Sequence, residues 1–128
     1  MPVDNNETEV RAVFEQWLAA VQRQDLDATV QNHTDDVVMY DVPDPGHVEG
    51  LKEYRECFRD FFPFISKGVF EAWDLRIVAG DNAAFSHCMI RCGAKPDDTF
   101  PVRLTLGYRK VDGAWLIAHE HHSVTAKS

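Results

Sequence analysis

The residues best suited to chemistry in this chain lie together near its C-terminus, in the run His119, Glu120, His121 and His122. They follow the apolar residues 114–118. A strand that only completed a core would stay apolar to its end, so the pattern indicates a segment that lines a polar site at one end. Imidazole and carboxylate groups there could transfer protons in acid–base catalysis.

Side chains of a strand alternate between its two faces, which divides this segment into two sets. One face would carry Trp115, Ile117, His119, His121 and Ser123. The other would carry Leu116, Ala118, Glu120 and His122. The residues alone leave open which face lines a pocket.

His119 and His121 also have the spacing of two metal ligands on one strand face. A catalytic zinc usually needs a third protein ligand, and His87 is the only evident donor. No HExxH or CxxC motif supports such a site, so we expect no metal. Arg91 and Arg103 lie in expected strands, where each could pair with Glu120 or Asp41 or could anchor a substrate carboxylate.

Helices are expected in the first half of the chain. Apolar residues at helical spacing predict a helix over about residues 7–24, with Asn6 and Glu9 as its capping box. Asp25 can cap a short helix over residues 26–33. A third helix follows Gly50 and is expected to end near Pro63. Its apolar stripe is Leu51, Tyr54, Cys57, Phe58, Phe61 and Phe62.

Strands are expected over residues 37–41, 69–78 and 83–93, followed by a hairpin with its turn at Asp112 and Gly113. In the strand expected over residues 69–78, alternation places four side chains on one face: Val69, Trp73, Leu75 and Ile77. Helices followed by strands, without βαβ alternation, indicate the α+β class. Most of the aromatic side chains are expected in the core, with some on a pocket wall: Trp17, Phe58, Phe61, Phe62, Trp73 and Phe85.

The length of 128 residues favours one domain over residues 1–128. A net charge of −8 without a Lys/Arg run argues against nucleic acid and anionic membrane as partners. No apolar stretch approaches the ~20 residues of a membrane helix, and the N-terminus lacks signal-peptide features, so a cytoplasmic location is expected. The three cysteines, Cys57, Cys88 and Cys92, are expected to be reduced. No glycine-rich phosphate loop is present, so no organic cofactor is expected.

The layout resembles the SnoaL-like and ketosteroid-isomerase-like superfamily, to which nuclear transport factor also belongs. The segments that carry the resemblance are HTDDVVMYD (33–41), GLKEYRECFRDFF (50–62), AGDNAAFSH (79–87) and RLTLGYRKVDGAWLIAHEHHS (103–123). The last segment also resembles the end of the association domain of calcium/calmodulin-dependent kinase, an oligomerisation module with a pocket. The resemblance implies a cone-shaped fold, in which a curved antiparallel sheet wraps around N-terminal helices and encloses a pocket.

The same resemblance assigns roles to single residues. Asp41 matches the general-base aspartate of the ketosteroid isomerases, although an Asp before Pro43 could also simply cap a turn. The oxyanion hole of those enzymes is not matched, because Trp17 replaces its Tyr and Leu106 lies near its Asp. Phe58 replaces a supporting Tyr. True steroid isomerisation is therefore not expected.

The kinase-like segment implies which strand face lines the pocket. It favours one set of side chains as the face that lines the pocket: Leu104, Leu106, Tyr108, Ala118, Glu120 and His122. The opposite set would lie on the outer face, which often forms dimer contacts in the superfamily. It contains Arg103, Thr105, His119 and His121. Further pocket candidates are Trp17, Tyr54, Phe58, Phe62, His87 and Arg91.

These observations predict a homodimer with a pocket for a small hydrophobic ligand. The expected activity is cofactor-independent acid–base catalysis, such as isomerisation, cyclisation or dehydration, on a small apolar carbonyl compound. Asp41 would be the base, His122 or Glu120 would relay protons, and Tyr108 or Arg91 would orient the substrate. The alternative is a ligand-binding or oligomerisation module without turnover.

Overall fold

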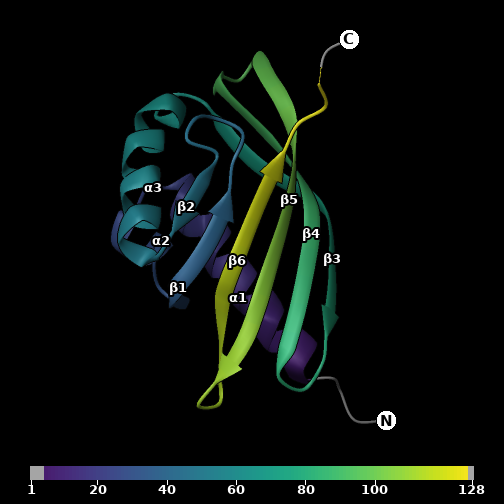
Figure 1. The fold of residues 1–128 in the computed structure, drawn as a ribbon. Coiled ribbons are helices and arrows are strands. Elements are labelled where there is room, and N and C mark those ends of the chain that lie inside the picture. Colours follow the sequence, from purple (N-terminus) through teal and green to yellow (C-terminus); the bar gives the residue numbers. More distant parts are fainter. Residues whose placement is uncertain (1–4, 127–128) are drawn as a thin grey trace.

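A curved six-stranded sheet wraps around the helices in the computed structural model of this protein, which describes residues 5–126 (Figure 1). The helices are α1 (Asn5–Gln22), α2 (Leu26–Thr29) and α3 (Leu51–Ile65). The strands are β1 (His33–Tyr40), β2 (His47–Glu49), β3 (Val69–Ala79), β4 (Ala83–Lys95), β5 (Asp98–Val111) and β6 (Ala114–Ser123). The predicted α+β class and cone-like arrangement are therefore correct.

The strands lie in the order β2-β1-β6-β5-β4-β3. All neighbouring pairs are antiparallel except β1 and β6, which run parallel, so the prediction of a wholly antiparallel sheet is wrong at this pair. β1 follows the first two helices, and β6, the last strand, lies beside it and runs in the same direction. β2 was not predicted, since its three residues are too short to give a pattern.

The helices differ from the prediction mainly at their ends. Asp25 caps α2 as predicted, its side chain accepting a hydrogen bond from the Ala28 amide. Asn6 is itself helical, so the predicted capping box is wrong. Pro63 lies inside α3 rather than at its end, and the helix continues to the buried Ile65. Within residues 5–126, no helix has both the length and the apolar character needed to cross a bilayer.

A bulge in β3 changes which side chains face the helices. The register with β4 shifts between Trp73 and Arg76, and Asp74 has a positive φ of 58°. Before the bulge, Phe70 is buried at 6% exposure and Trp73, on the opposite face, is 44% exposed, whereas after the bulge Leu75 and Ile77 pack against the core. The prediction that Val69 and Trp73 share a face with Leu75 and Ile77 is wrong, because alternation restarts at the bulge. Phe85, predicted to lie in the core, is also exposed.

A second bulge lies in β6. Ile117 pairs with Tyr108 and His119 pairs with Gly107, so Ala118 is an extra residue without a partner on β5. Trp115 and Ile117 are buried before the bulge, and Glu120 is buried after it. The predicted division of residues 115–123 into two sets is therefore wrong across Ala118. The bulge brings the apolar start of the strand and its polar end onto the same inner face.

Candidate active site

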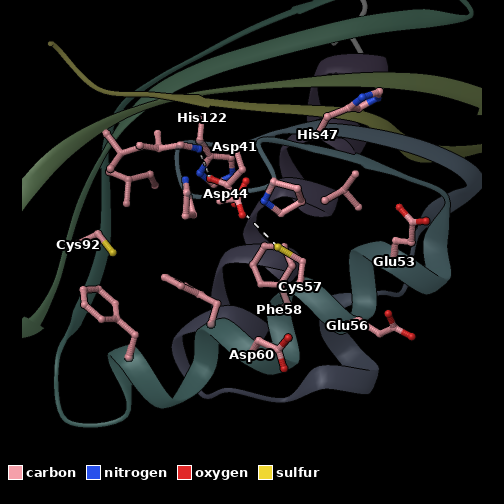
Figure 2. Close-up of a pocket in the computed structure, with 18 of the residues that line it drawn as sticks. Asp41, Asp44, His47, Glu53, Glu56, Cys57, Phe58, Asp60, Cys92 and His122 are labelled. Carbon is pink, nitrogen blue, oxygen red and sulfur yellow. Dashed lines mark hydrogen bonds between the residues drawn. The ribbon is translucent and has the colours of Figure 1, made fainter.

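A cavity of about 800 Å³ lies between α3, the loop that joins β1 to β2, and the inner face of β4 and β5 (Figure 2). Its wall is mostly aromatic and aliphatic: Phe58, Phe61, Phe64, Phe70, Phe100, Ile90 and Val102. Asp41 and His122 also line it, and Figure 2 shows their side chains close together, with Cys57 and Phe58 facing them from α3. The cavity thus combines an apolar wall with polar groups that include Asp41 and His122, as small-molecule sites do.

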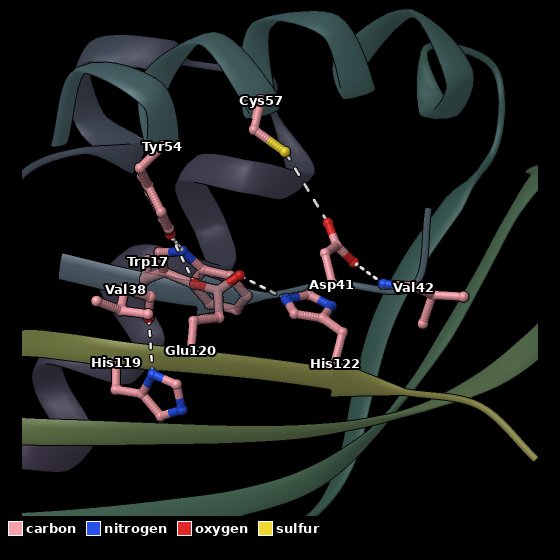
Figure 3. A network of polar contacts seen from close by, with 9 residues as sticks. All are labelled: Trp17, Val38, Asp41, Val42, Tyr54, Cys57, His119, Glu120 and His122. Atoms are coloured by element: carbon pink, nitrogen blue, oxygen red, sulfur yellow. Dashed lines mark hydrogen bonds and ion pairs between the residues drawn. The ribbon is translucent and has the colours of Figure 1, made fainter. Parts of the chain in front are cut away.

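A chain of buried hydrogen bonds supports His122 from behind (Figure 3). The indole Nε1 of Trp17 donates to the Tyr54 hydroxyl at 3.0 Å, and that hydroxyl donates to Glu120 Oε1 at 2.7 Å. The other carboxylate oxygen of Glu120 bonds to Nε2 of His122. Glu120 has 0% exposure, so it reaches the cavity only through the imidazole of His122.

The fold supplies each member of this chain from a different element. Trp17 lies on the buried stripe of α1, and Tyr54 lies in the first turn of α3, which begins after Gly50. Glu120 and His122 follow the bulge of β6 at successive inward positions. Because all three elements pack in one core, the imidazole of His122 is held in a fixed orientation.

Opposing effects set the protonation of His122. Burial would lower its pKa, but the charge and hydrogen bond of Glu120, together with the charge of Asp41, raise the pKa above its usual value. Burial raises the pKa of Tyr54 well above its usual value, and Glu120 adds to that shift. Tyr54 therefore remains a hydrogen-bond donor. Burial lowers the pKa of His33, whose ring packs on Tyr54 with centroids 4.6 Å apart.

Asp41 directly follows β1 at the edge of the cavity and is half-buried. One carboxylate oxygen accepts a hydrogen bond from the Val42 amide at 2.8 Å. The other lies 3.9 Å from the Cys57 sulfur, a weak interaction. Burial, with the charge of Asp41 next, raises the pKa of the Cys57 thiol to about 11, so the thiol stays neutral. This second oxygen of Asp41 is therefore available to a ligand.

Six of the predicted pocket residues lie in three places. Phe58 lines the cavity as predicted. Trp17 and Tyr54 lie behind it in the hydrogen-bonded chain. Three others are buried in the core without lining the cavity: Phe62, Leu106 and Tyr108. The Tyr108 hydroxyl is bonded to Ser86 at 2.7 Å, so the prediction that it orients a substrate in this cavity is wrong.

The strand arginines and His87 lie away from the cavity. Arg91 pairs with Glu71 on the outside of the sheet, and Arg103 donates to the hydroxyls of Ser123 and Thr125. Neither pairs with Glu120 or Asp41, so those predicted pairings are wrong, as is the placement of Arg91 in the pocket. His87 lines a separate shallow depression with Arg103.

His119 and His121 lie on the outer face, as the kinase-like segment implied. Both rings pack edge-on against exposed Tyr40, with centroids 5.1 and 5.3 Å apart from its ring. Nδ1 of His119 bonds to the Val38 carbonyl at 2.7 Å. In the sheet, His87 on β4 lies opposite Thr105 on β5, and Thr105 lies opposite His121 on β6. One strand therefore separates the two histidines. Within residues 5–126, no three His, Cys, Asp or Glu side chains are grouped to hold a metal.

Sequence analysis missed several acidic residues that line the cavity: Asp44, Glu53, Glu56 and Asp60. A signal for three of them was present, since Glu53, Glu56 and Asp60 repeat at helical spacing on α3. The wall residues Ile90 and Phe100 were missed because their neighbours across the cavity come from a helix distant in sequence.

Comparison with known proteins identifies the family. A model of the SnoaL-like domain matches residues 10–127, and the chain belongs to that family. A comparison with curated proteins found no match.

Solved structures agree with the fold. An NTF2-like protein of unknown function from Pseudomonas putida KT2440 is 29% identical, with a TM-score of 0.90 over 98% of this chain and 90% of that one. A proposed dehydratase of the NTF2-like family from Streptomyces avermitilis is 16% identical, with a TM-score of 0.81 over 97% and 99%. A ketosteroid isomerase-like protein from Erwinia carotovora atroseptica is 19% identical, with a TM-score of 0.76 over 98% and 100%.

Proposed function

We propose that this protein catalyses proton transfer on a small apolar carbonyl compound, in an isomerisation, cyclisation or dehydration. The observation that carries the proposal is the position of His122, whose ring lies between the carboxylates of Glu120 and Asp41 at the polar end of an apolar cavity (Figure 3). An acid and a base side by side are what enolisation needs. Membership of a family that includes isomerases and dehydratases supports the same reaction classes.

The protonation states assign the roles. Asp41, as a carboxylate, removes a proton from the carbon next to the carbonyl group. His122, whose pKa is raised by its two acidic neighbours against the effect of burial, donates a hydrogen bond or a proton to the carbonyl oxygen. In an isomerisation Asp41 returns the proton to another carbon. In a dehydration His122 gives its proton to the departing hydroxyl group, which leaves as water.

Glu120 and Tyr54 act as positioning residues in this proposal. Glu120 is buried behind His122 and cannot touch a ligand, so the predicted relay of protons by Glu120 becomes a role in orienting and charging the imidazole. Trp17 does not act as an oxyanion donor here, because its N–H is bonded to Tyr54. His122 takes the place of the missing oxyanion hole.

The test is proton exchange at carbon. Small cyclic enones and β-hydroxy ketones are incubated with the protein in D₂O, and deuterium incorporation next to the carbonyl is followed by NMR. Asp41→Asn is expected to lower the exchange rate by about 100-fold or more. Asp35→Asn changes an exposed acid on β1, the strand that precedes Asp41; it is the matched control and should leave the rate unchanged. Exchange that survives Asp41→Asn would remove Asp41 from the role of base.

The second candidate is a ligand-binding module without turnover. The predominantly apolar wall of the cavity favours it, since such a wall can hold a hydrophobic ligand without any reaction. Tight binding of a ligand without exchange at any carbon would support this function over the first.

We also propose that the protein forms a homodimer through the outer face of the sheet. This face carries exposed apolar side chains, including Trp73 and the cross-strand pair of Val78 and Phe85. Sedimentation should give twice the mass of the chain, and Val78→Ser with Phe85→Ser should shift it toward the monomer. A monomer at micromolar concentration would contradict the proposal.

A further inference from the structure

We propose that the cavity selects ligands that combine an apolar body with a cationic group, such as a protonated amine, and disfavours carboxylates and phosphate esters. This inference rests on the proposed function, because it names the substrate class of the same cavity. It goes beyond that function by specifying the charge of the ligand at the end away from the reacting carbonyl group.

The acidic and the basic side chains of α3 differ in whether they line the cavity. Acidic residues at helical spacing line the cavity: Glu53, Glu56 and Asp60. The basic residues of the same helix also repeat at helical spacing, yet none of them lines the cavity: Lys52, Arg55 and Arg59. The acidic side chains of α3 therefore contribute negative charge to the lining of the cavity, whereas its basic side chains lie outside that lining.

The opposite wall adds to this negative charge. Asp41 and Asp44, from the segment after β1, also line the cavity, which brings the lining carboxylates to five. No Lys or Arg within residues 5–126 lines it. The two lining histidines do not offset the difference, because His122 is bonded to buried Glu120 and His47 is paired with Glu49. A cleft with one sign of charge and apolar walls focuses its field on a ligand.

We call the lining carboxylates other than Asp41 the mouth carboxylates: Asp44, Glu53, Glu56 and Asp60. Their charges are only partly neutralised by neighbouring groups. Asp60 lies 3.3 Å from Arg59, but both side chains are largely exposed, so water and salt weaken that pair. Glu53 accepts a hydrogen bond from the Glu49 amide, which leaves its charge in place. In the described part of the chain, Asp44 and Glu56 form no ion pair.

Aromatic rings at the mouth complement these charges. Phe64 and Phe100 line the cavity and are each 44% exposed, so their rings meet both ligand and solvent. The face of an aromatic ring attracts an ammonium group, whereas a carboxylate gains nothing from it. A ligand with its carbonyl group near His122 and its hydrocarbon against the phenyl rings would therefore be best completed by an ammonium group near the acids of α3.

The experiment compares three probes with the same hydrocarbon: phenylbutylamine, phenylbutanol and phenylbutanoate. Their affinities for the whole protein are measured by calorimetry at neutral pH, at low and at high salt. The amine is expected to bind about tenfold more tightly than the alcohol at low salt, and the carboxylate more weakly than either. High salt should reduce the preference for the amine.

A matched pair of variants locates the effect. Glu56→Gln with Asp60→Asn removes two charges from the mouth and should reduce the preference for the amine to about threefold, without changing the affinity of the alcohol. Glu15→Gln with Asp81→Asn removes two charges from exposed positions that do not line the cavity, and should leave the preference unchanged.

The outcomes separate this inference from the proposed function. Binding of the alcohol with an equal or higher affinity for the carboxylate than for the amine would overturn the charge preference and leave the apolar cavity intact. An equal loss of preference in both double variants would overturn the role of the mouth. Binding of none of the three probes would contradict the inference, whereas the proposed function is tested separately by deuterium exchange into carbonyl compounds.

Discussion

The last strand places adjacent titratable residues in two different environments. On the inner face, Glu120 is buried and His122 is bonded to it at the edge of the cavity. On the outer face, His119 and His121 lie beside the exposed ring of Tyr40, and His121 is itself exposed. Residue type is similar on the two faces, so the environment alone distinguishes His122, a candidate catalytic residue with a buried partner, from the surface histidines. The chemistry proposed for His122 therefore depends on burial and on a partner behind the imidazole.

The contrast is sharpest for Glu120. Glu120→Ala would leave the Tyr54 hydroxyl and a charged His122 without their buried partner, and is expected to lower the free energy of unfolding by about 3 kcal/mol. His121→Ala, on the same strand but exposed, should change it by less than about 0.5 kcal/mol. Urea denaturation followed by fluorescence measures both. Similar losses for the two variants would mean that the two faces do not differ as described.

Titration of the histidines by NMR tests the same contrast at single side chains. The pKa of His122 is raised by its acidic neighbours against the effect of burial, and that of His33 is lowered by burial, so His122 should titrate at higher pH than His33. Because its folded pKa exceeds the unfolded value of 6.5, His122 stabilises the fold fully below that value. This stability is lost as the pH rises through the folded pKa.

Glu120→Gln is the control for that titration. It removes the charge while retaining a similar side-chain shape, and should lower the pKa of His122. An unchanged pKa in this variant would show that Glu120 does not hold the imidazole in its charged form.

Sequence reasoning found the class of fold because long periodic segments determine it. The stripes of α1 and α3 and the long hairpin of β5 and β6 were all visible as patterns. The two bulges were not, because one extra residue at Ala118 or a backbone turn at Asp74 leaves composition unchanged and reverses the faces that follow. Trp73 was grouped with Leu75 and Ile77 for this reason, whereas Phe85 was misplaced because outer sheet faces can also be apolar.

Within the site, Asp41 and His122 were proposed from the family resemblance and lie together at the cavity. The role of Tyr54 as the partner of Glu120 was not foreseen, since the two residues are 66 positions apart. Contacts between a helix and a strand so distant in sequence depend on packing rather than on any local pattern. The acidic mouth was missed because a charged helix face also resembles an ordinary solvated one.

Tyr54→Phe tests that long-range contact with a smaller expected effect. It removes the hydroxyl that accepts from Trp17 and donates to Glu120, and should lower the free energy of unfolding by about 1–2 kcal/mol. The pH profile of proton exchange should also shift, because Glu120 would hold His122 less firmly. Tyr40→Phe on the outer face should change neither quantity. An effect on stability without any shift of the profile would make Tyr54 purely structural.

The smallest effect is expected at Arg91, where the sequence allowed a substrate anchor. Its guanidinium lies 3.2 Å from Glu71 on the outside of the sheet, and both side chains are partly exposed to solvent. Arg91→Gln should therefore lower the free energy of unfolding by less than about 0.5 kcal/mol. Because Arg91 does not line the cavity, the affinity of phenylbutanoate should also stay the same in calorimetry. A substantial loss of that affinity would mean that a ligand reaches the outer face, and the separation of the two faces would then be wrong.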